Sequence, residues 1–169
     1  MKKYLPLLIF ICAVPLSAME LEYPEIINNG TILINAGIGF AGAINSRGER
    51  VCPPLTVSLD YALPIAGFPL TLGLIAGFFS EKVKSDQINY LPVAFRIGYH
   101  LPFNVRRLDT YFLFTIGGIP TEMNGSMGGE FWMGFSAGVR YFFLPHFGAY
   151  TELGFDNVQI ITFGLAFNL

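Results

Sequence analysis

Hydrophobic and polar residues alternate with a period of two along most of this chain. The alternation is clearest at residues 55–63, where Leu55, Val57, Leu59, Tyr61 and Leu63 alternate with Thr56, Ser58, Asp60 and Ala62. Such a pattern places successive side chains on opposite faces of a β-strand. Glycine, proline and asparagine interrupt it at near-regular intervals, which marks strand ends. We expect eight strands, at residues 31–43, 55–63, 70–79, 89–100, 110–118, 131–143, 148–156 and 158–169.

The connections between these strands alternate in length and chemistry. Those near residues 44–54, 80–88 and 119–130 are long and polar, whereas those near 64–69 and 144–147 are short and contain proline. Long outer loops and short periplasmic turns are typical of transmembrane β-barrels. Two connections depart from this rule, because residues 101–109 form a long inner turn and residues 156–157 a tight outer one.

The charged residues show which strand face meets which solvent. Within the strands, the charges occupy the small, polar parity, and the bulky apolar parity carries none; they are Asp60, Arg96, Arg140, Glu152 and Asp156. An arginine that faces lipid at the midplane costs about 2–4 kcal/mol, so lipid-facing positions exclude charge. A soluble lipocalin-type barrel has the opposite arrangement, apolar inside and polar outside. The pattern therefore predicts a barrel with hydrocarbon around it.

Composition supports a membrane protein without membrane helices. The 169 residues are 53% hydrophobic and 13% charged, against about 25% charged in ordinary soluble domains. After the first twenty residues, no apolar run approaches the ~18 residues of a spanning helix. Only helices and closed barrels satisfy every backbone group in lipid. We therefore expect an all-β fold, an eight-stranded antiparallel up-and-down transmembrane β-barrel.

The N-terminus has the features of an export signal. Lys2 and Lys3 precede an apolar stretch at residues 5–14, and Ser17 and Ala18 form a small-residue cleavage site. We expect residues 1–18 to be a signal peptide, 19–30 a periplasmic segment, either tail or plug, and 31–169 the barrel. Eight basic and twelve acidic residues then remain, a net charge of −4. No basic patch stands out, so nucleic acid is a poor partner.

The last eight residues resemble the signal read by the outer-membrane insertion machinery. Thr162, Gly164, Phe167 and Leu169 match its polar, glycine, aromatic and hydrophobic positions, although the family more often ends in Phe. In size and layout the chain is similar to small eight-stranded outer-membrane proteins of the OmpA, OmpX and OmpW kind. The resemblance implies a location in the outer membrane of a Gram-negative-type envelope. It also implies outer-membrane lipid, periplasmic chaperones and the barrel-insertion machinery as partners.

Four of the strand charges are predicted to form a layer in the periplasmic third of the barrel: Asp60, Arg96, Arg140 and Glu152. Arg140 and Glu152 lie at similar distances from the turn between their strands and share the inner parity, so they can be direct cross-strand partners. Asp60 and Arg96 are separated by one strand, where Gly73 leaves room to reach across. Unpaired charges in a narrow interior are costly, so these should pair. The layer is either a packed polar core or a gate for small solutes.

Three other patterns carry weaker hypotheses. Residues 37–42 match the dinucleotide fingerprint GxGxxG, but turn-forming residues rather than a helix follow, so we expect no nucleotide and no cofactor. Ser58, Asp60 and His100 share the inner parity and would be the triad of a lipid-modifying enzyme. Both histidines, His100 and His146, lie beside inner turns, which disfavours that reading. No His/Cys cluster suggests a metal site.

Aromatic residues gather near both strand ends, as in interfacial girdles. The outer girdle is predicted to contain Phe131, Trp132 and Phe155, and the inner one Tyr61, Tyr99, Tyr141 and Phe143. Cys52 is placed in the first outer loop, as an incidental thiol or an intermolecular disulfide partner. The stretch 121–130, with its glycines and methionines, is either a binding loop or a linker.

These patterns favour a non-enzymatic integral outer-membrane protein with a structural or adhesive role through its loops, whose host or surface ligand the sequence does not identify. The alternatives are a narrow channel for small or hydrophobic solutes, as the OmpW resemblance implies, and the lipid-modifying enzyme.

Overall fold

The computed structural model describes residues 27–42, 48–65, 68–101, 103, 105–155 and 158–169. The predicted signal peptide, most of segment 19–30, and Asp156 lie outside the described residues. The rest forms β-strands, ordered β1 (Ile32–Gly42), β2 (Glu49–Ala62), β3 (Leu70–Val83), β4 (Asp86–Tyr90), β5 (Val93–Leu101), β6 (Leu108–Met123), β7 (Ser126–Leu144), β8 (Phe147–Phe155) and β9 (Gln159–Asn168). No helix in these ranges is long and apolar enough to cross a membrane.

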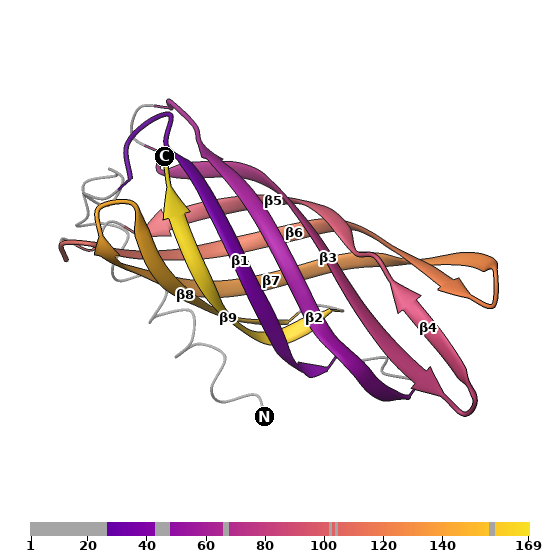
Figure 1. Ribbon diagram of the computed structural model, residues 1–169. Helices are drawn as coiled ribbons and strands as arrows, with labels where there is room; N and C mark the ends of the chain where they lie inside the picture. Colours follow the sequence, from indigo (N-terminus) through magenta and orange to yellow (C-terminus); the bar gives the residue numbers. More distant parts are fainter. Residues whose placement is uncertain (1–26, 43–47, 66–67, 102, 104, 156–157) are drawn as a thin grey trace, which may run out of the picture.

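The strands close into a ring of antiparallel neighbours, as the tilted ribbons of Figure 1 show. The β1–β9 ladder closes it, with pairs running from Leu33↔Asn168 to Gly42↔Gln159. Segments β4 and β5 both pair with β3 on one side and with β6 on the other. They therefore act as one interrupted strand, so nine segments make an eight-membered barrel. The predicted fold class is confirmed.

The interruption between β4 and β5 falls at Leu91 and Pro92. Proline has no backbone N–H to give to a ladder, so it is tolerated in sheets mainly at edges and irregularities. The neighbours still bond across the break, because the N–H of Gly77 donates to the Pro92 carbonyl and that of Leu91 to the Pro120 carbonyl, both at 2.9 Å. The predicted single strand 89–100 therefore occupies one place in the barrel wall, but its ladder of paired residues is interrupted at Leu91 and Pro92.

The outer connections differ from the prediction. Residues 80–88 and 119–130 are not loops but the ends of strand hairpins, paired down to Val83↔Asp86 and Met123↔Ser126. Asn124 and Gly125 form the β6–β7 turn with φ of 49° and 78°. Asn-Gly with positive φ is the favoured two-residue hairpin turn. This dipeptide was the sequence signal for a hairpin where a loop was expected.

Side chains of opposite character cover the two faces of the wall. Large apolar side chains point outward and are exposed along every long strand, including Leu59, Leu74, Phe95, Phe135 and Leu165. The inward positions are buried and hold both the polar residues and a smaller apolar set. Exposed apolar area on this scale is a membrane-facing or partner-facing surface.

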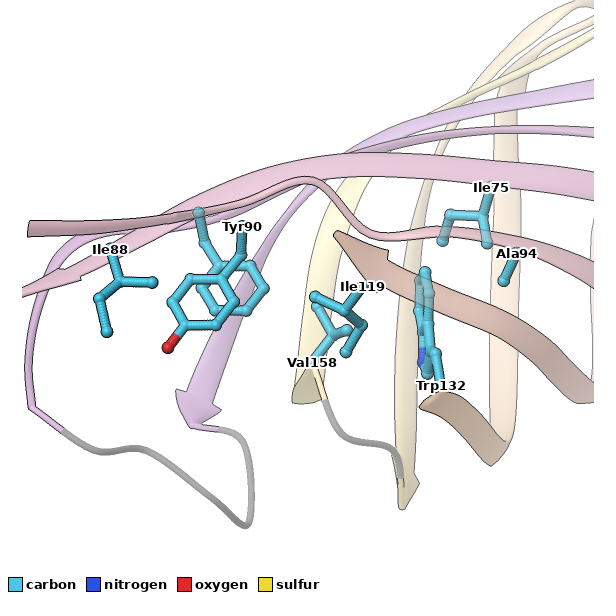
Figure 2. Packing of buried hydrophobic residues seen from close by; sticks show 8 residues of the cluster. Ile75, Ile88, Tyr90, Ala94, Ile119, Trp132 and Val158 are labelled. Atoms are coloured by element: carbon cyan, nitrogen blue, oxygen red, sulfur yellow. The ribbon is translucent and has the colours of Figure 1, made fainter. Parts of the chain in front are cut away.

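The inward side chains form three layers from the outer mouth to the end where both termini of the barrel lie. The outer layer is an apolar cluster, shown in Figure 2, of Ile75, Phe79, Ile88, Tyr90, Ala94, Ile119, Trp132 and Val158. The middle layer holds most of the buried polar and charged residues, among them Asp60, Arg96, Asp109, Arg140 and Glu152. The inner layer is a second apolar cluster of Ile27, Leu33, Ala62, Phe142, Tyr150 and Ala166. Because Ile27 precedes β1 in the chain and packs in this cluster, the segment just before β1 lies against the inner end of the barrel.

Candidate functional site

The middle layer is built around a contact that crosses one strand. Gly73 on β3 pairs with Asp60 of β2 on one side and with Arg96 of β5 on the other. Over this glycine, Nε of Arg96 lies 3.0 Å from Oδ1 of Asp60. A β-carbon at position 73 would collide with that carboxylate oxygen. The lack of a side chain at Gly73 is therefore what lets the two charges meet.

Arg140 on β7 is the most highly connected residue of the layer. Its Nη1 donates to Oδ2 of Asp109 at 2.6 Å, and its Nε donates to Oδ1 of Asn35 at 2.9 Å. Its Nη2 lies 3.4 Å from Oδ2 of Asp60. The guanidinium carbon also stands 3.8 Å from the centroid of the Tyr111 ring. Contacts from three other strands, β1, β2 and β6, thus meet at one side chain.

Glu152 does not pair with Arg140 as predicted. The β7–β8 register sets Arg140 opposite Tyr150 and Glu152 opposite Gly138. Glu152 instead accepts hydrogen bonds at Oε1 from Nη2 of Arg96 and from the Tyr111 hydroxyl, both at 3.0 Å. Similar distances from the turn do not fix the partner, and in the β7–β8 ladder Arg140 faces Tyr150, two residues before Glu152.

His100 joins the layer through residues that the predicted triad does not contain. Its Nδ1 lies 2.7 Å from Oδ1 of Asp109, and its Nε2 lies 3.2 Å from Oγ1 of Thr71. Ser58 bonds instead to the amide of Asn35 at 2.9 Å. The hydrogen-bonded series is therefore Thr71–His100–Asp109, and its side chains are buried. A substrate outside the barrel has no contact with it.

The layer is larger than the sequence suggested. It contains the four predicted charges and also Asn35, Thr71, His100, Asp109 and Tyr111. The predicted inner turn at residues 101–109 includes Asp109, but Asp109 lies in β6 and shares its parity with Tyr111, Leu113 and Thr115. Extending the alternation by one residue would have found it. Gly138 makes room for Tyr111, because a β-carbon there would collide with the tyrosine ring.

The predicted girdle residues point outward with one exception. Phe131, Phe155, Tyr61, Tyr141 and Phe143 are exposed, and Tyr99 is half-buried. Trp132 is buried within the outer apolar layer, next to Ile119 and Val158 in Figure 2, so its place in the girdle was wrong. The reason is its parity, which it shares with the inward Ser136 and Arg140. Its indole Nε1 has no hydrogen-bond partner among the described residues.

The remaining predicted residues lie along strands. Thr162 and Gly164 of the C-terminal motif are on the inward parity of β9, whereas Phe167 and Leu169 are exposed on the outside. The glycines of the GxGxxG match lie on β1, where a β-carbon on Gly37 would collide with the Tyr150 hydroxyl. Cys52 lies in β2 opposite Ser80 rather than in a loop, and its thiol is free. Within the described ranges, no His, Cys, Asp and Glu group is arranged to hold a metal ion.

A second candidate site is the sheet that continues beyond the rim. The outer parts of β2, β3, β4, β6 and β7 stay paired in that order above the level where β8 ends at Phe155. We call this part the blade; its β3–β4 and β6–β7 hairpins reach farthest from the C-terminal end in Figure 1. The 19 residues of β7 extend over about 60 Å, at ~3.3 Å per residue. A strand needs only about 9–11 residues to cross the hydrocarbon.

Solved structures with this geometry are outer-membrane barrels. The N-terminal β-barrel domain of Pseudomonas aeruginosa OprF superimposes with a TM-score of 0.59 at 17% identity, over 83% of this chain and 98% of that one. Neisserial surface protein A gives 0.61 at 12% identity, over 84% and 98%. The E. coli outer membrane protein W gives 0.54 at 13% identity, over 84% and 99%.

This chain has the fold of the small eight-stranded outer-membrane β-barrels. The predicted resemblance to that class is confirmed at the level of fold. No protein-family model and no curated protein matches the chain in sequence. At these identities the similarity shows the barrel fold alone, and the chemistry has to come from the chain's own residues.

Proposed function

We propose that this protein is a non-enzymatic integral protein of a bacterial outer membrane that binds an external partner through its blade. The observation that carries the proposal is the edge of β7. Among the described residues, positions 126–129 form a ladder with β6 only, so the blade ends in an edge strand. Sheet edges accept an extended strand of another protein through main-chain hydrogen bonds.

The composition of this edge suits strand addition. Residues 126–129 are Ser, Met, Gly and Gly, without the proline or lysine that commonly protect exposed edges. The Met127 side chain is 81% exposed at the tip of the blade. Methionine adapts its shape to different apolar partners. The edge thus offers main-chain pairing together with one adaptable apolar contact.

The interior favours this function over a channel. Apolar layers close the barrel above and below the charged layer, and eight strands enclose little more than side-chain volume. The buried Thr71–His100–Asp109 series likewise lacks access for a lipid substrate. The outer-membrane location is supported by the shared fold, by the outward apolar wall and by the predicted export signal. Contact with periplasmic chaperones and the insertion machinery remains part of the proposal.

Shortening the β6–β7 hairpin tests the proposal. Deleting residues 121–123 and 126–128 removes three facing pairs and leaves Asn124 and Gly125 as the turn between Pro120 and Gly129, which are themselves paired. Bacteria that display the full chain should adhere to surfaces coated with extracellular-matrix proteins more than bacteria with empty vector. The shortened variant should lose that gain.

The amounts of both proteins at the cell surface are matched by antibody labelling, and heat-modifiable gel migration verifies folding. Equal adherence by the shortened variant would overturn the role of the blade. No gain for the full chain over empty vector on any coated surface would overturn the adhesive function itself.

A further inference from the structure

The outside of the barrel wall contains an apolar groove over β6, β7, β8 and β9. Its volume is about 460 Å³, within the ~300–1,000 Å³ of small-molecule sites. The residues that shape it include Phe112, Phe135, Ala137, Leu153, Phe155 and Ile160. We call it the wall groove.

The wall groove exists because a small residue stands among large ones. Ala137 is paired with Phe112 on β6 and with Leu153 on β8, and two residues further out Phe135 is paired with Phe155. The methyl group of Ala137 therefore forms a floor between four large side chains. Those side chains are exposed, from 52% for Phe112 to 76% for Phe155, so the groove opens outward.

The chemistry of the wall groove limits what it can hold. The side chains that frame it are apolar, and its one hydroxyl belongs to Ser136, which is on the inward parity and also lines the space inside, so the groove offers no charge to a head group or a free carboxylate. An unpaired charge in such surroundings would be strongly disfavoured. The groove also lies on the lipid-facing side of a transmembrane wall, where hydrocarbon is the solvent. Its occupant should be a flexible hydrocarbon chain whose polar end lies elsewhere.

We propose that the wall groove is a binding site for one acyl chain of a lipid of the outer leaflet. The groove lies further out along β7 and β8 than Arg140 and Glu152 and reaches the outer end of β8 at Phe155. The chain is therefore one from the outer half of the bilayer. Between apolar solvents the hydrophobic effect gives no preference, so selective binding comes from closer van der Waals packing.

The acyl chain stays outside the barrel. Ser136, Gly154 and Ile160 line the wall groove and also a small space inside, which Glu152, Gln159 and Thr162 complete. That inner space measures about 10 Å³, which is at most enough for one water. The wall at Gly154 is thus one residue thick, and the inner side has no room for a hydrocarbon chain.

Photocrosslinking tests the site directly. The refolded protein is placed in phosphatidylcholine vesicles that contain a trace of phosphatidylcholine with a diazirine on one acyl chain, and adducts are mapped by mass spectrometry. Adducts should be enriched on β7 and β8 around Ala137 and Leu153 by about tenfold over other outward positions, equivalent to about 1.4 kcal/mol. Ala137→Phe fills the groove and should remove the enrichment, and Ala137→Leu should reduce it.

Ala76→Phe is the matched control. Ala76 is also an exposed outward alanine, on β3 between Val57 and Val93, away from the wall groove. It should keep the wild-type adduct pattern. Adducts spread evenly around the wall, or an unchanged pattern in folded Ala137→Phe, would overturn the site. The site depends on the proposed membrane location but not on adhesion. Ala137→Phe should adhere normally, so failure of the groove and failure of the blade give different results.

Discussion

Arg140 shows how a charged residue is accommodated inside this barrel. It is 1% exposed, and its guanidinium meets two carboxylates, one amide and one aromatic ring. A buried ion network is not by itself strong evidence of stability, but removing one member leaves the others buried and uncompensated. The polar layer therefore tolerates coordinated changes better than single ones.

We expect Arg140→Ala to lower the free energy of unfolding by about 3–5 kcal/mol, because Asp60 and Asp109 lose a buried partner. Urea unfolding of the protein in lipid vesicles measures this free energy. Arg106, an exposed arginine on the inner turn, is the control, and Arg106→Ala should stay within about 0.5 kcal/mol. Losses of equal size in the two variants would mean that the network contributes nothing particular to stability.

Individual residues were predictable from the sequence only where their parity was read consistently. Asp60, Arg96, Arg140 and Glu152 could be placed inside from alternation alone. Which of them touch depended on the register, and the irregularity between Tyr141 and Leu144 cannot be seen in a pattern of hydrophobicity. Trp132 lies inside because the parity of its position, and not its aromatic character, decides which face of β7 it occupies.

Among the elements, the strands were predictable near the inner end and not near the outer end. Inside the membrane, alternation is enforced by lipid on one face and packing on the other. At the tip of the β6–β7 hairpin, residues 122–129 are exposed on both faces, so the sequence there no longer needs an apolar parity. The β6–β7 hairpin is consequently rich in glycine and methionine and resembles a loop, although its two strands pair with each other down to the turn.

The Asn124 and Gly125 turn should control the tip of the blade alone. Gly125→Val places a β-branched residue at a φ of 78°, which costs about 1–2 kcal/mol. Amide hydrogen exchange should therefore accelerate about tenfold at residues 121–127, since 1.4 kcal/mol is a factor of ten. Exchange at Phe112 and Ala137, inside the barrel, should not change.

Ser126→Ala, at the neighbouring exposed position, is the control and should leave exchange at the tip as it is. If Gly125→Val accelerated exchange throughout β6 and β7, the hairpin would be one cooperative unit with the barrel, contrary to this prediction.

At the scale of the whole molecule, the barrel interior is filled in three layers rather than lined. The inward residues of β7 illustrate this, because Trp132, Arg140 and Phe142 belong to the outer, middle and inner layers in turn. The fold class could be predicted from the sequence because the alternation of apolar and polar residues shows which face of each strand meets lipid and which meets the interior. The packing of side chains inside the barrel could not be predicted, because it depends on which side chains from the eight strands lie at the same height.

We expect the refolded protein to show no stepwise current in planar lipid bilayers. Glu152→Ala should be equally silent, because it removes charge from the middle layer and leaves both apolar layers in place. Stepwise current in Glu152→Ala alone would show that the ion pairs close the lumen, and current in the wild type would favour the channel function.

The two apolar layers also separate the charges of the middle layer from the salt of the surroundings. Mobile ions weaken interactions between charges only where they can approach them, and surface charge pairs are screened beyond about 8 Å at physiological ionic strength. The arginines and carboxylates of the middle layer lie between two layers of apolar side chains, and lipid surrounds the barrel wall. A bacterium that moves between fresh water and brine would change the electrostatics of the blade, while the charges that hold the wall together would remain as they were.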